Sequence, residues 1–265
     1  MQHQISIIIP VLNEKAFIGK LLRHLQTTSS KENISEIIVV DGGSTDGSQS
    51  IIKAMARQEC SLDHIKNELS MSGRAESRPY KDPPTTLEDI PILLLESTKG
   101  RAKQMNLGVK KATGSILYFL HADSFPPKYF DKYIIHEVQK GNLAGCFRMQ
   151  FDSNHWWLKL ASWFTRFNWK SCRGGDQSLF ITKTLFQDIG GYDERYNVYE
   201  DNILIKELYS RKQFTVIHEN LKSSARMYQK HGVWKLQYYY WRIHFKQWLG
   251  ADANTLYSYY KRKVC

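Results

Sequence analysis

The stretch Gly114-Ser-Ile-Leu-Tyr-Phe-Leu-His-Ala-Asp123 joins a short apolar run to an abrupt polar end. The run from Ile116 to Leu120 is typical of a buried β-strand, and a histidine and an acid follow it. In a parallel α/β sheet, ligands bind in the crevice outside the carboxyl ends of the strands. We therefore expect His121-Ala-Asp123 to lie at a binding site, where a carboxylate can hold a hard divalent cation against a diphosphate.

Strand and helix patterns alternate on both sides of this stretch. The expected strands cover residues 4–10, where Pro10 ends the first strand, and residues 36–40, 92–95 and 115–120. The expected helices cover residues 14–26, with Asn13 as N-cap, and residues 48–58, 101–112 and 126–139. Beyond them we expect an extended segment at 143–151, a Trp-rich helix at 156–163, a strand at 177–182 and a helix at 201–210. The alternation predicts an α/β fold with a mostly parallel central sheet and right-handed crossovers.

The alternation breaks between residues 60 and 90, where the sequence is polar, proline-containing and aperiodic. A structureless segment of this length is uncommon inside a compact domain, so we predict a mobile surface insertion. A passive insertion and a cover over the active site both remain open.

Length and composition indicate a globular protein. The 265 residues suffice for one large α/β domain or two small ones. No secretory signal and no run of about 18 apolar residues occurs, so we expect a cytoplasmic chain, soluble or bound at a membrane surface. The cysteines have no paired spacing, which predicts free thiols in a reducing compartment. They are Cys60, Cys146, Cys172 and Cys265.

The positive charge is concentrated at the C-terminal end. Nine Lys or Arg against one acid place +8 of the net +11 in residues 220–265. We expect a basic, amphipathic, helical region at 221–265, with aromatic and basic residues interleaved at 226–249. Such a helix can lie in a membrane interface, or it can pack on the core with its lysines in water. Charge alone permits nucleic-acid binding, but no recognised motif supports it and we do not expect it.

Four motifs occur in order along the chain. They are Ile7-Ile-Ile-Pro-Val-Leu-Asn-Glu14, Val39-Val-Asp-Gly-Gly-Ser-Thr-Asp-Gly-Ser48, Gly100-Arg-Ala-Lys-Gln-Met-Asn-Leu-Gly108 and His121-Ala-Asp123. Together they resemble the family 2 glycosyltransferases over about residues 4 to 250. The resemblance implies the GT-A fold, a Rossmann-like nucleotide-diphospho-sugar transferase fold in which a nucleotide-sugar-binding half meets an acceptor-binding half. It divides the chain into a GT-A domain at 1–220, with the donor half at 1–123 and the acceptor half at 124–220, and the C-terminal region at 221–265.

A narrower resemblance concerns one branch of that family. Lys99-Gly-Arg-Ala-Lys-Gln-Met-Asn106, Phe119-Leu-His-Ala-Asp-Ser124 and Gly175-Asp-Gln-Ser-Leu-Phe180 resemble the arsenosugar-biosynthesis or radical-SAM/selenodomain-associated transferases. That name reflects gene context and identifies no acceptor.

The family resemblance implies a set of donor residues. The nucleotide-binding residues would be Pro10, Asn13, Glu14, Asp41, Gly43, Lys99 and Arg101. Asp41 would bind the base, which suits an ionised carboxylate that accepts N–H donors. Glycines beside it permit a tight turn and close approach of a ligand, although Asp-Gly sequences also form plain turns. Arg101 or Lys99 would pair with the diphosphate, unless both simply begin a solvated helix.

The same resemblance implies a metal site. Asp123 aligns with the metal-binding acid of the family's Asp-x-Asp motif, and His121 stands where the first acid usually is. The cofactor would be Mn²⁺ or Mg²⁺, and a histidine is a poorer ligand than a carboxylate for hard Mg²⁺. His121 can therefore ligate the metal, contact ribose or phosphate, or satisfy a buried hydrogen bond.

The catalytic and acceptor residues follow from two further motifs. Tyr199-Glu-Asp201 resembles the family's Glu-Asp pair, which makes Asp201 the general base, while Glu200 binds the acceptor or sets the pKa of Asp201. Two acids at a helix start also complement the helix dipole without any catalytic role. Gly175, Asp176 and Gln177 resemble an acceptor-side loop, and a structural turn is the alternative.

The sequence thus predicts an inverting, divalent-metal-dependent glycosyltransferase. It would move a sugar from a nucleotide-diphospho-sugar to a hydroxyl of a sugar, lipid-linked or small-molecule acceptor. A non-catalytic nucleotide-sugar-binding protein at a membrane surface is one alternative. A sugar nucleotidyltransferase is a weaker alternative, because Pro10-Val-Leu-Asn-Glu-Lys15 stands where those enzymes carry a Gly-rich basic loop.

Overall fold

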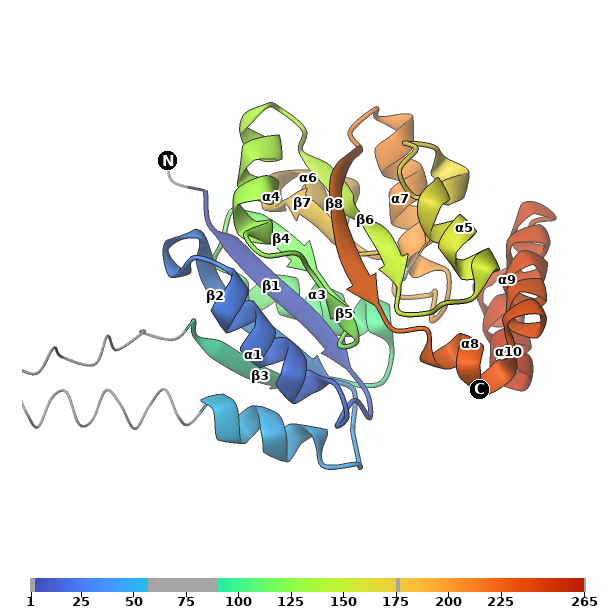
Figure 1. Ribbon diagram of the computed structural model, residues 1–265, viewed down its shortest axis with the longest axis horizontal. Helices are drawn as coiled ribbons and strands as arrows, with labels where there is room; N and C mark the ends of the chain where they lie inside the picture. The colour runs from blue at the N-terminus through green and yellow to red at the C-terminus, as the bar shows by residue number, and fades with distance from the viewer. Residues whose placement is uncertain (1–2, 57–89, 175–176, 265) are drawn as a thin grey trace, which may run out of the picture.

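The computed structural model describes residues 3–56, 90–174 and 177–264, and it contains an eight-stranded sheet with helices on both faces (Figure 1). The strand order is β3-β2-β1-β4-β7-β6-β8-β5. Four of the seven strand pairings are parallel and three are antiparallel. The predicted α/β fold is therefore confirmed. Most of the predicted insertion at 60–90 lies outside the described residues.

The half of the sheet that the resemblance assigns to the donor, called the donor half below, is entirely parallel. Its strands are β1 (Ile5–Val11), β2 (Ile34–Asp41), β3 (Ile92–Glu96) and β4 (Ile116–Phe119). β1 lies between β2 and β4, and β3 pairs with the other side of β2. Because these strands run in one direction, their carboxyl ends lie at one edge of the sheet.

Two apolar layers hold the helices against the sheet. One face packs α1 (Ile18–Thr28), the helix at residues 48–56 and α4 (Phe130–Gln139). The other face packs α3 (Arg101–Lys111), α6 (Lys183–Ile189) and α7 (Glu200–Ser210). The apolar residues of β1 alternate between the layers, with Ile7 in the first and Ile8 in the second, and both are fully buried. Burying one such side chain is worth about 1.5–3 kcal/mol, so these layers position the helix ends at the sheet edge.

The other half of the sheet, which the resemblance assigns to the acceptor, has strands of mixed directions. β7 (Leu179–Thr182) is antiparallel to β4, β6 (Ala144–Phe151) is antiparallel to β7, and β8 (Thr215–Ser223) is parallel to β6. β5 (Ser124–Phe125) pairs with the end of β8. Two reversals restore the direction of β1, so β6 and β8 end at the same edge as the donor strands. Neither β5 nor β8 is predicted from the sequence.

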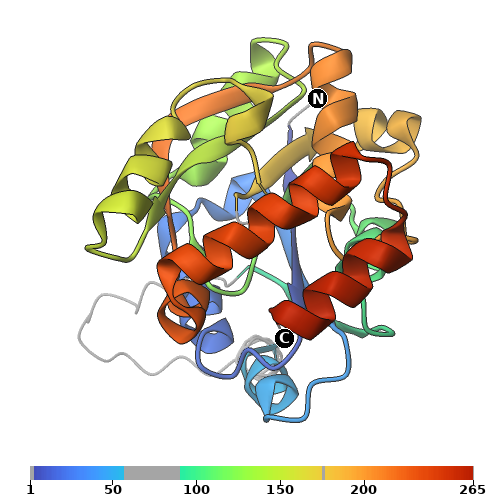
Figure 2. The ribbon, with the colours of Figure 1, turned by 90° about the vertical axis from the view of Figure 1, so that its right-hand side faces the viewer.

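Three helices follow β8 and cover one side of the molecule (Figure 2). They are α8 (Arg226–His231), α9 (Val233–Trp248) and α10 (Ala253–Lys263). β8 crosses residue 220, so the helical C-terminal region begins at Arg226. The expected helix at 226–249 is broken at Gly232, where a φ of 81° ends α8. Within the described part of the chain, no helix combines the length and apolar character needed to cross a bilayer.

Several predicted boundaries are wrong. β1 continues past Pro10 to Val11, because its pairing with β4 ends at Ile8 and Pro10 needs no ladder donor on that side. The first helix begins at Ile18, four residues late, and Asn13 is not its cap. Asn13 has a φ of 58°, and its side chain instead accepts a hydrogen bond from the N–H of Thr45.

The remaining elements follow the predicted pattern more closely. α5 (Trp156–Phe164) is the Trp-rich helix, and short 3-10 turns occupy Lys31–Asn33 and Lys170–Cys172. α4 begins at Phe130, because the Pro126-Pro127 pair and left-handed Tyr129 precede it. Cys146 and Cys172 are free thiols, while Cys60 and Cys265 lie outside the described residues.

Candidate active site

Two strand ends at the sheet edge are joined by a buried amide. The Gln104 side chain, on α3, donates hydrogen bonds to the carbonyl oxygens of Val11 at 2.9 Å and Val40 at 2.7 Å. Only 2% of Gln104 is exposed. The glutamine lies inside the third sequence motif, but its role as a clamp between β1 and β2 was not predicted.

Asp41 ends β2 as a fully buried carboxylate. Its Oδ2 accepts hydrogen bonds from the N–H groups of Gly43 and Ser44 and from the Gln49 amide, at 2.7–3.0 Å. Burial by itself raises the pKa of Asp41, but hydrogen bonds from Ser44, Gln49 and Gly43 outweigh burial and lower it on balance. Its Oδ1 is buried and accepts no hydrogen bond from any described residue, which leaves an ionised acceptor for a ligand N–H.

The loop after β1 is tied to the loop after β2. The Asn13 N–H donates to the Ser44 hydroxyl at 2.8 Å, and the Glu14 N–H donates to the Ser48 hydroxyl at 2.9 Å. Gly43 has a φ of 92°, so the turn after Asp41 needs a residue that tolerates the left-handed region. Asn13 and Glu14 therefore build the wall beside Asp41, and Pro10 lies buried in β1 behind it.

One guanidinium joins Glu14 to Asp123. Arg226, at the start of α8, donates to both Glu14 oxygens, with Nη1 2.7 Å from Oε2, and its Nε lies 3.1 Å from Asp123 Oδ2. The guanidinium also lies over the Phe17 ring, 4.8 Å from its centroid. Sequence reasoning missed Arg226, because nothing local distinguishes it from the other basic residues of the C-terminal region.

The predicted metal residues offer a limited ligand set. His121 and Asp123 follow β4, and the Asp123 side chain is 17% exposed. The place where Glu14, Asp123 and Arg226 meet is called the donor corner below. No three His, Cys, Asp or Glu side chains within residues 3–56, 90–174 and 177–264 gather closely enough to hold a metal. A carboxylate is a suitable ligand for a hard cation, and the further ligands would have to come from water or a bound phosphate.

The two acids at the start of α7 meet Arg101. Its Nε lies 2.7 Å from Glu200 Oε1, and its Nη2 lies 3.9 Å from Asp201 Oδ2. Glu200 is fully buried and Asp201 is 9% exposed. Burial, and then the charges of Asp201 and Glu200, raise the pKa of nearby Tyr192 well above its ordinary value. Arg101 therefore lies against the acceptor-side acids, at the edge where we expected it to meet a diphosphate.

α3 also holds the loop that precedes those acids. The Asn106 amide donates to the Tyr192 carbonyl at 2.8 Å and accepts from the Tyr192 N–H at 3.1 Å. Lys99, just before α3, is exposed. The third motif thus connects the donor strands to the acid pair at the start of α7.

The expected acceptor loop is only partly described. Gly175 and Asp176 lie outside the described residues. The Gln177 side chain is buried, accepts hydrogen bonds from Arg173 and Cys146, and donates to the Cys172 carbonyl. Its amide is engaged internally, so Gln177 supports this loop from within and does not present its amide to an acceptor.

The sequence matches the model of one protein family. The model for "Glycosyl transferase family 2" covers residues 6–78 and 80–203. It includes the loops after β1 and β2, the donor corner at Asp123 and the acid pair of α7.

Individual relatives share 15–26% of their residues with this chain over the matched regions. Glycosyltransferase AglE of Haloferax volcanii is 26% identical over 122 residues, which are 46% of this chain and 31% of that protein. The mannosyltransferase PcManGT from Pyrobaculum calidifontis, in complex with GDP-Man and Mn²⁺, superposes with a TM-score of 0.62 at 17% identity. S. aureus TarS in complex with UDP gives a TM-score of 0.56 at 15% identity. The match covers 93% and 84% of this chain, and 62% and 60% of those two chains, so this chain spans less than two thirds of each relative.

Proposed function

Because the chain belongs to glycosyl transferase family 2, we propose that it transfers a sugar from a nucleotide-diphospho-sugar to an acceptor hydroxyl. One observation carries this proposal. Asp41, Asp123 and the Glu200–Asp201 pair reach one edge of the sheet, where Arg226 contacts Asp123 and Arg101 contacts Glu200 and Asp201. In this proposal Asp41 recognises the donor base, Asp123 serves diphosphate binding and Asp201 activates the acceptor, so the three roles have separate acids at one edge.

The donor nucleotide lies between the loops after β1 and β2. Asp41 accepts an N–H of the base through Oδ1, which is buried and accepts no hydrogen bond from a described residue, and Pro10, Asn13, Glu14 and Gly43 form the surrounding wall. Lys99 and Arg101 contribute positive charge toward the diphosphate. The complexes of PcManGT with GDP-Man and of TarS with UDP support a nucleotide-linked donor.

Asp123, with His121 beside it, would hold a divalent cation, Mn²⁺ or Mg²⁺, whose charge would stabilise the diphosphate leaving group. The Mn²⁺ in the PcManGT complex supports this role. Arg226, held by its bidentate contact with Glu14, would add a fixed positive charge beside the diphosphate.

Asp201 removes the proton of the acceptor hydroxyl as that oxygen attacks the anomeric carbon, with inversion. Glu200 holds Arg101 beside the base, because the Arg101 Nε lies 2.7 Å from Glu200 Oε1 while its Nη2 lies 3.9 Å from Asp201 Oδ2. The resemblance assigns Gly175, Asp176 and Gln177 to acceptor binding, and of these the structure describes only Gln177, which supports its loop from within. The arsenosugar-biosynthesis or radical-SAM/selenodomain branch resemblance is part of this proposal, and it leaves the acceptor as a sugar, lipid-linked or small-molecule hydroxyl.

Helix α9 makes peripheral contact with the inner face of a membrane. Five of its aromatic side chains are more than half exposed: Trp234, Tyr238, Trp241, Phe245 and Trp248. The +8 charge of residues 220–265 complements anionic lipid headgroups. Co-sedimentation with phosphatidylglycerol vesicles tests this contact, and loss of binding is expected for Trp241→Ser combined with Trp248→Ser.

A donor screen tests the enzymatic proposal. UDP-, GDP- and dTDP-sugars are added with Mn²⁺ or Mg²⁺, and the melting temperature is expected to rise for a true donor. Asp123→Asn and Asp201→Asn should each abolish sugar transfer with the fold intact by circular dichroism. Near-normal turnover of Asp201→Asn would remove the base assignment. Release of pyrophosphate from a nucleoside triphosphate and a sugar phosphate would favour a nucleotidyltransferase instead.

A further inference from the structure

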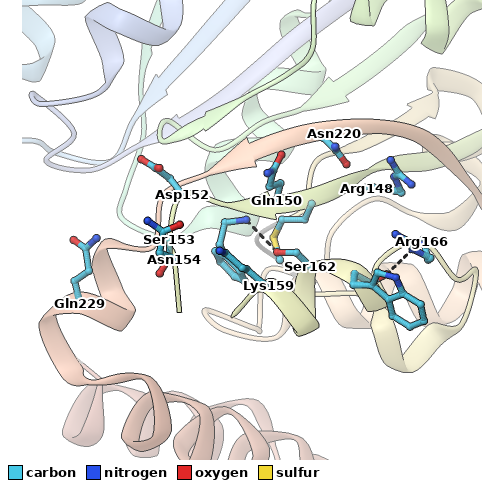
Figure 3. A pocket seen from close by; sticks show the side chains of 13 residues that line it. Arg148, Gln150, Asp152, Ser153, Asn154, Lys159, Ser162, Arg166, Asn220 and Gln229 are labelled. Atoms are coloured by element: carbon cyan, nitrogen blue, oxygen red, sulfur yellow. Dashed lines mark hydrogen bonds between the residues drawn. The ribbon is translucent and has the colours of Figure 1, made fainter. Parts of the chain in front are cut away.

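A polar pocket of about 830 Å³ lies between β6, β8 and α5, beside the catalytic edge (Figure 3). Three cationic side chains line it: Arg148, Lys159 and Arg166. Asp152 is the one carboxylate in the lining. Amide and hydroxyl groups make up much of the remaining lining, among them Gln150, Asn154, Ser162, Asn220 and Gln229, and Met149, Phe151 and Trp163 also line the pocket. The balance of charge and the polar lining favour an anionic ligand.

Arg148 supplies a buried cationic donor to this pocket. It lies opposite Asn220 in the β6–β8 ladder, and Figure 3 places both on the sheet side of the pocket. Its Nε is buried and donates no hydrogen bond to any described residue. A buried charged donor without an acceptor is costly, so the site is incomplete without an anion or water.

The α5 side supplies the opposing cations. The Arg166 Nε donates to the Trp163 carbonyl at 3.1 Å, and its guanidinium lies 4.6 Å from the centroid of the Trp163 ring. These contacts hold the guanidinium in place at the pocket, while exposed Lys159 adds a flexible charge one to two turns earlier on α5. A ligand in the pocket therefore meets positive charge from the sheet and from the helix.

The pocket adjoins the proposed active site. The Asp152 N–H donates to the Ser223 carbonyl at 2.9 Å, and the Ser224 N–H donates to the Asp123 carbonyl at 3.2 Å. Two such hydrogen-bonded spacings put Asp152 about 10 Å from the Asp123 segment. A molecule bound in the pocket can thus extend toward the Asp123 segment of the proposed active site.

We infer that this pocket binds a phosphate group carried by the acceptor. The inference rests on the proposed glycosyltransferase function and specifies its acceptor as a phosphorylated molecule. Guanidinium groups donate in forked pairs, and a phosphate accepts such bonds from several sides at once. A neutral sugar hydroxyl needs no cluster of three cations. A soluble sugar phosphate and a lipid-borne phosphate share this chemistry.

Binding measurements on three variants test the inference. Arg148→Gln and Lys159→Gln remove pocket charges, and Lys110→Gln on the far helix α3 is the matched control. Glycerol 3-phosphate is titrated by calorimetry, and phosphatidic acid vesicles are used in parallel by sedimentation. We expect at least tenfold weaker binding for Arg148→Gln, about threefold weaker for the exposed Lys159→Gln, and no change for Lys110→Gln.

The two arms identify the source of the phosphate. Loss of glycerol 3-phosphate binding supports a soluble acceptor, and a loss confined to vesicles supports a lipid-borne one. Unchanged binding of both probes in Arg148→Gln and Lys159→Gln overturns the inference. Weaker nucleotide-sugar binding in these variants also overturns it, because the pocket would then serve the donor. Thermal shift with nucleotide-sugars on the wild-type protein separately tests the proposed function.

Discussion

Arg226 is expected to be the main electrostatic link between the C-terminal helices and the donor corner. The perturbation is Arg226→Gln, which removes the charge but keeps a polar side chain of similar length. In the wild-type protein this guanidinium pairs with Glu14 and Asp123 and covers Phe17. Its removal leaves two acids at one corner without their shared cation.

The size of the effect follows from these three contacts. A bidentate, charge-assisted pair is worth about 1.5–3 kcal/mol, and the 37% exposure of the Arg226 side chain favours the lower end for Glu14. The single contact with Asp123 adds up to about 1 kcal/mol. The contact with the Phe17 ring adds about 0.5 kcal/mol. Arg226→Gln should therefore lower the free energy of unfolding by about 2–3 kcal/mol.

Urea unfolding followed by tryptophan fluorescence measures this change, with divalent cations chelated by EDTA. A double-mutant cycle with Glu14→Gln should give a coupling energy of about 1–2 kcal/mol. Arg195→Gln is the matched control, since its ion pair with Asp193 involves a side chain that is 83% exposed, and no measurable change is expected. A coupling energy below about 0.5 kcal/mol would refute the assignment of Arg226 as the link.

Three further predictions concern packing, hydrogen bonding and pH. Gly108→Ala should lower the free energy of unfolding by about 1–2 kcal/mol in urea melts, because a Cβ there would lie 2.6 Å from Ile8 Cγ2. The cost of this clash exceeds the gain in helix propensity from Gly to Ala. An unchanged or higher free energy of unfolding would contradict this prediction. Gln104→Leu should cost about 2 kcal/mol and weaken nucleotide-sugar binding in a thermal-shift titration, because β1 and β2 lose their clamp, and unaltered donor binding would count against this role. Burial lowers the pKa of His244, so the unfolded chain takes up a proton first as pH falls below about 6.5, and stability should fall there. His244→Asn should flatten that part of the pH profile, and an equally steep profile would exclude His244 as its source.

The local sequence pattern was sufficient to predict the strands of the donor half. β1, β2 and β4 are short apolar runs buried on both faces, so their position is visible without the fold. Strand-end residues such as Asp41 and Asp123 follow directly from those runs. β8 was missed because Thr215–Ser223 mixes polar and apolar residues, and a register shift against β6 at Phe147–Arg148 interrupts its alternation.

By itself the sequence determined the α/β class, the parallel donor strands and the family resemblance, because these depend on periodicity and on residues close in the chain. Only the tertiary structure decided that Arg226, 212 residues from Glu14, completes the donor corner. It also decided that Gln177 turns inward and that Arg101 meets Glu200. An ion pair or a buried amide is specified by distance in space, and no local pattern records which distant side chain arrives there.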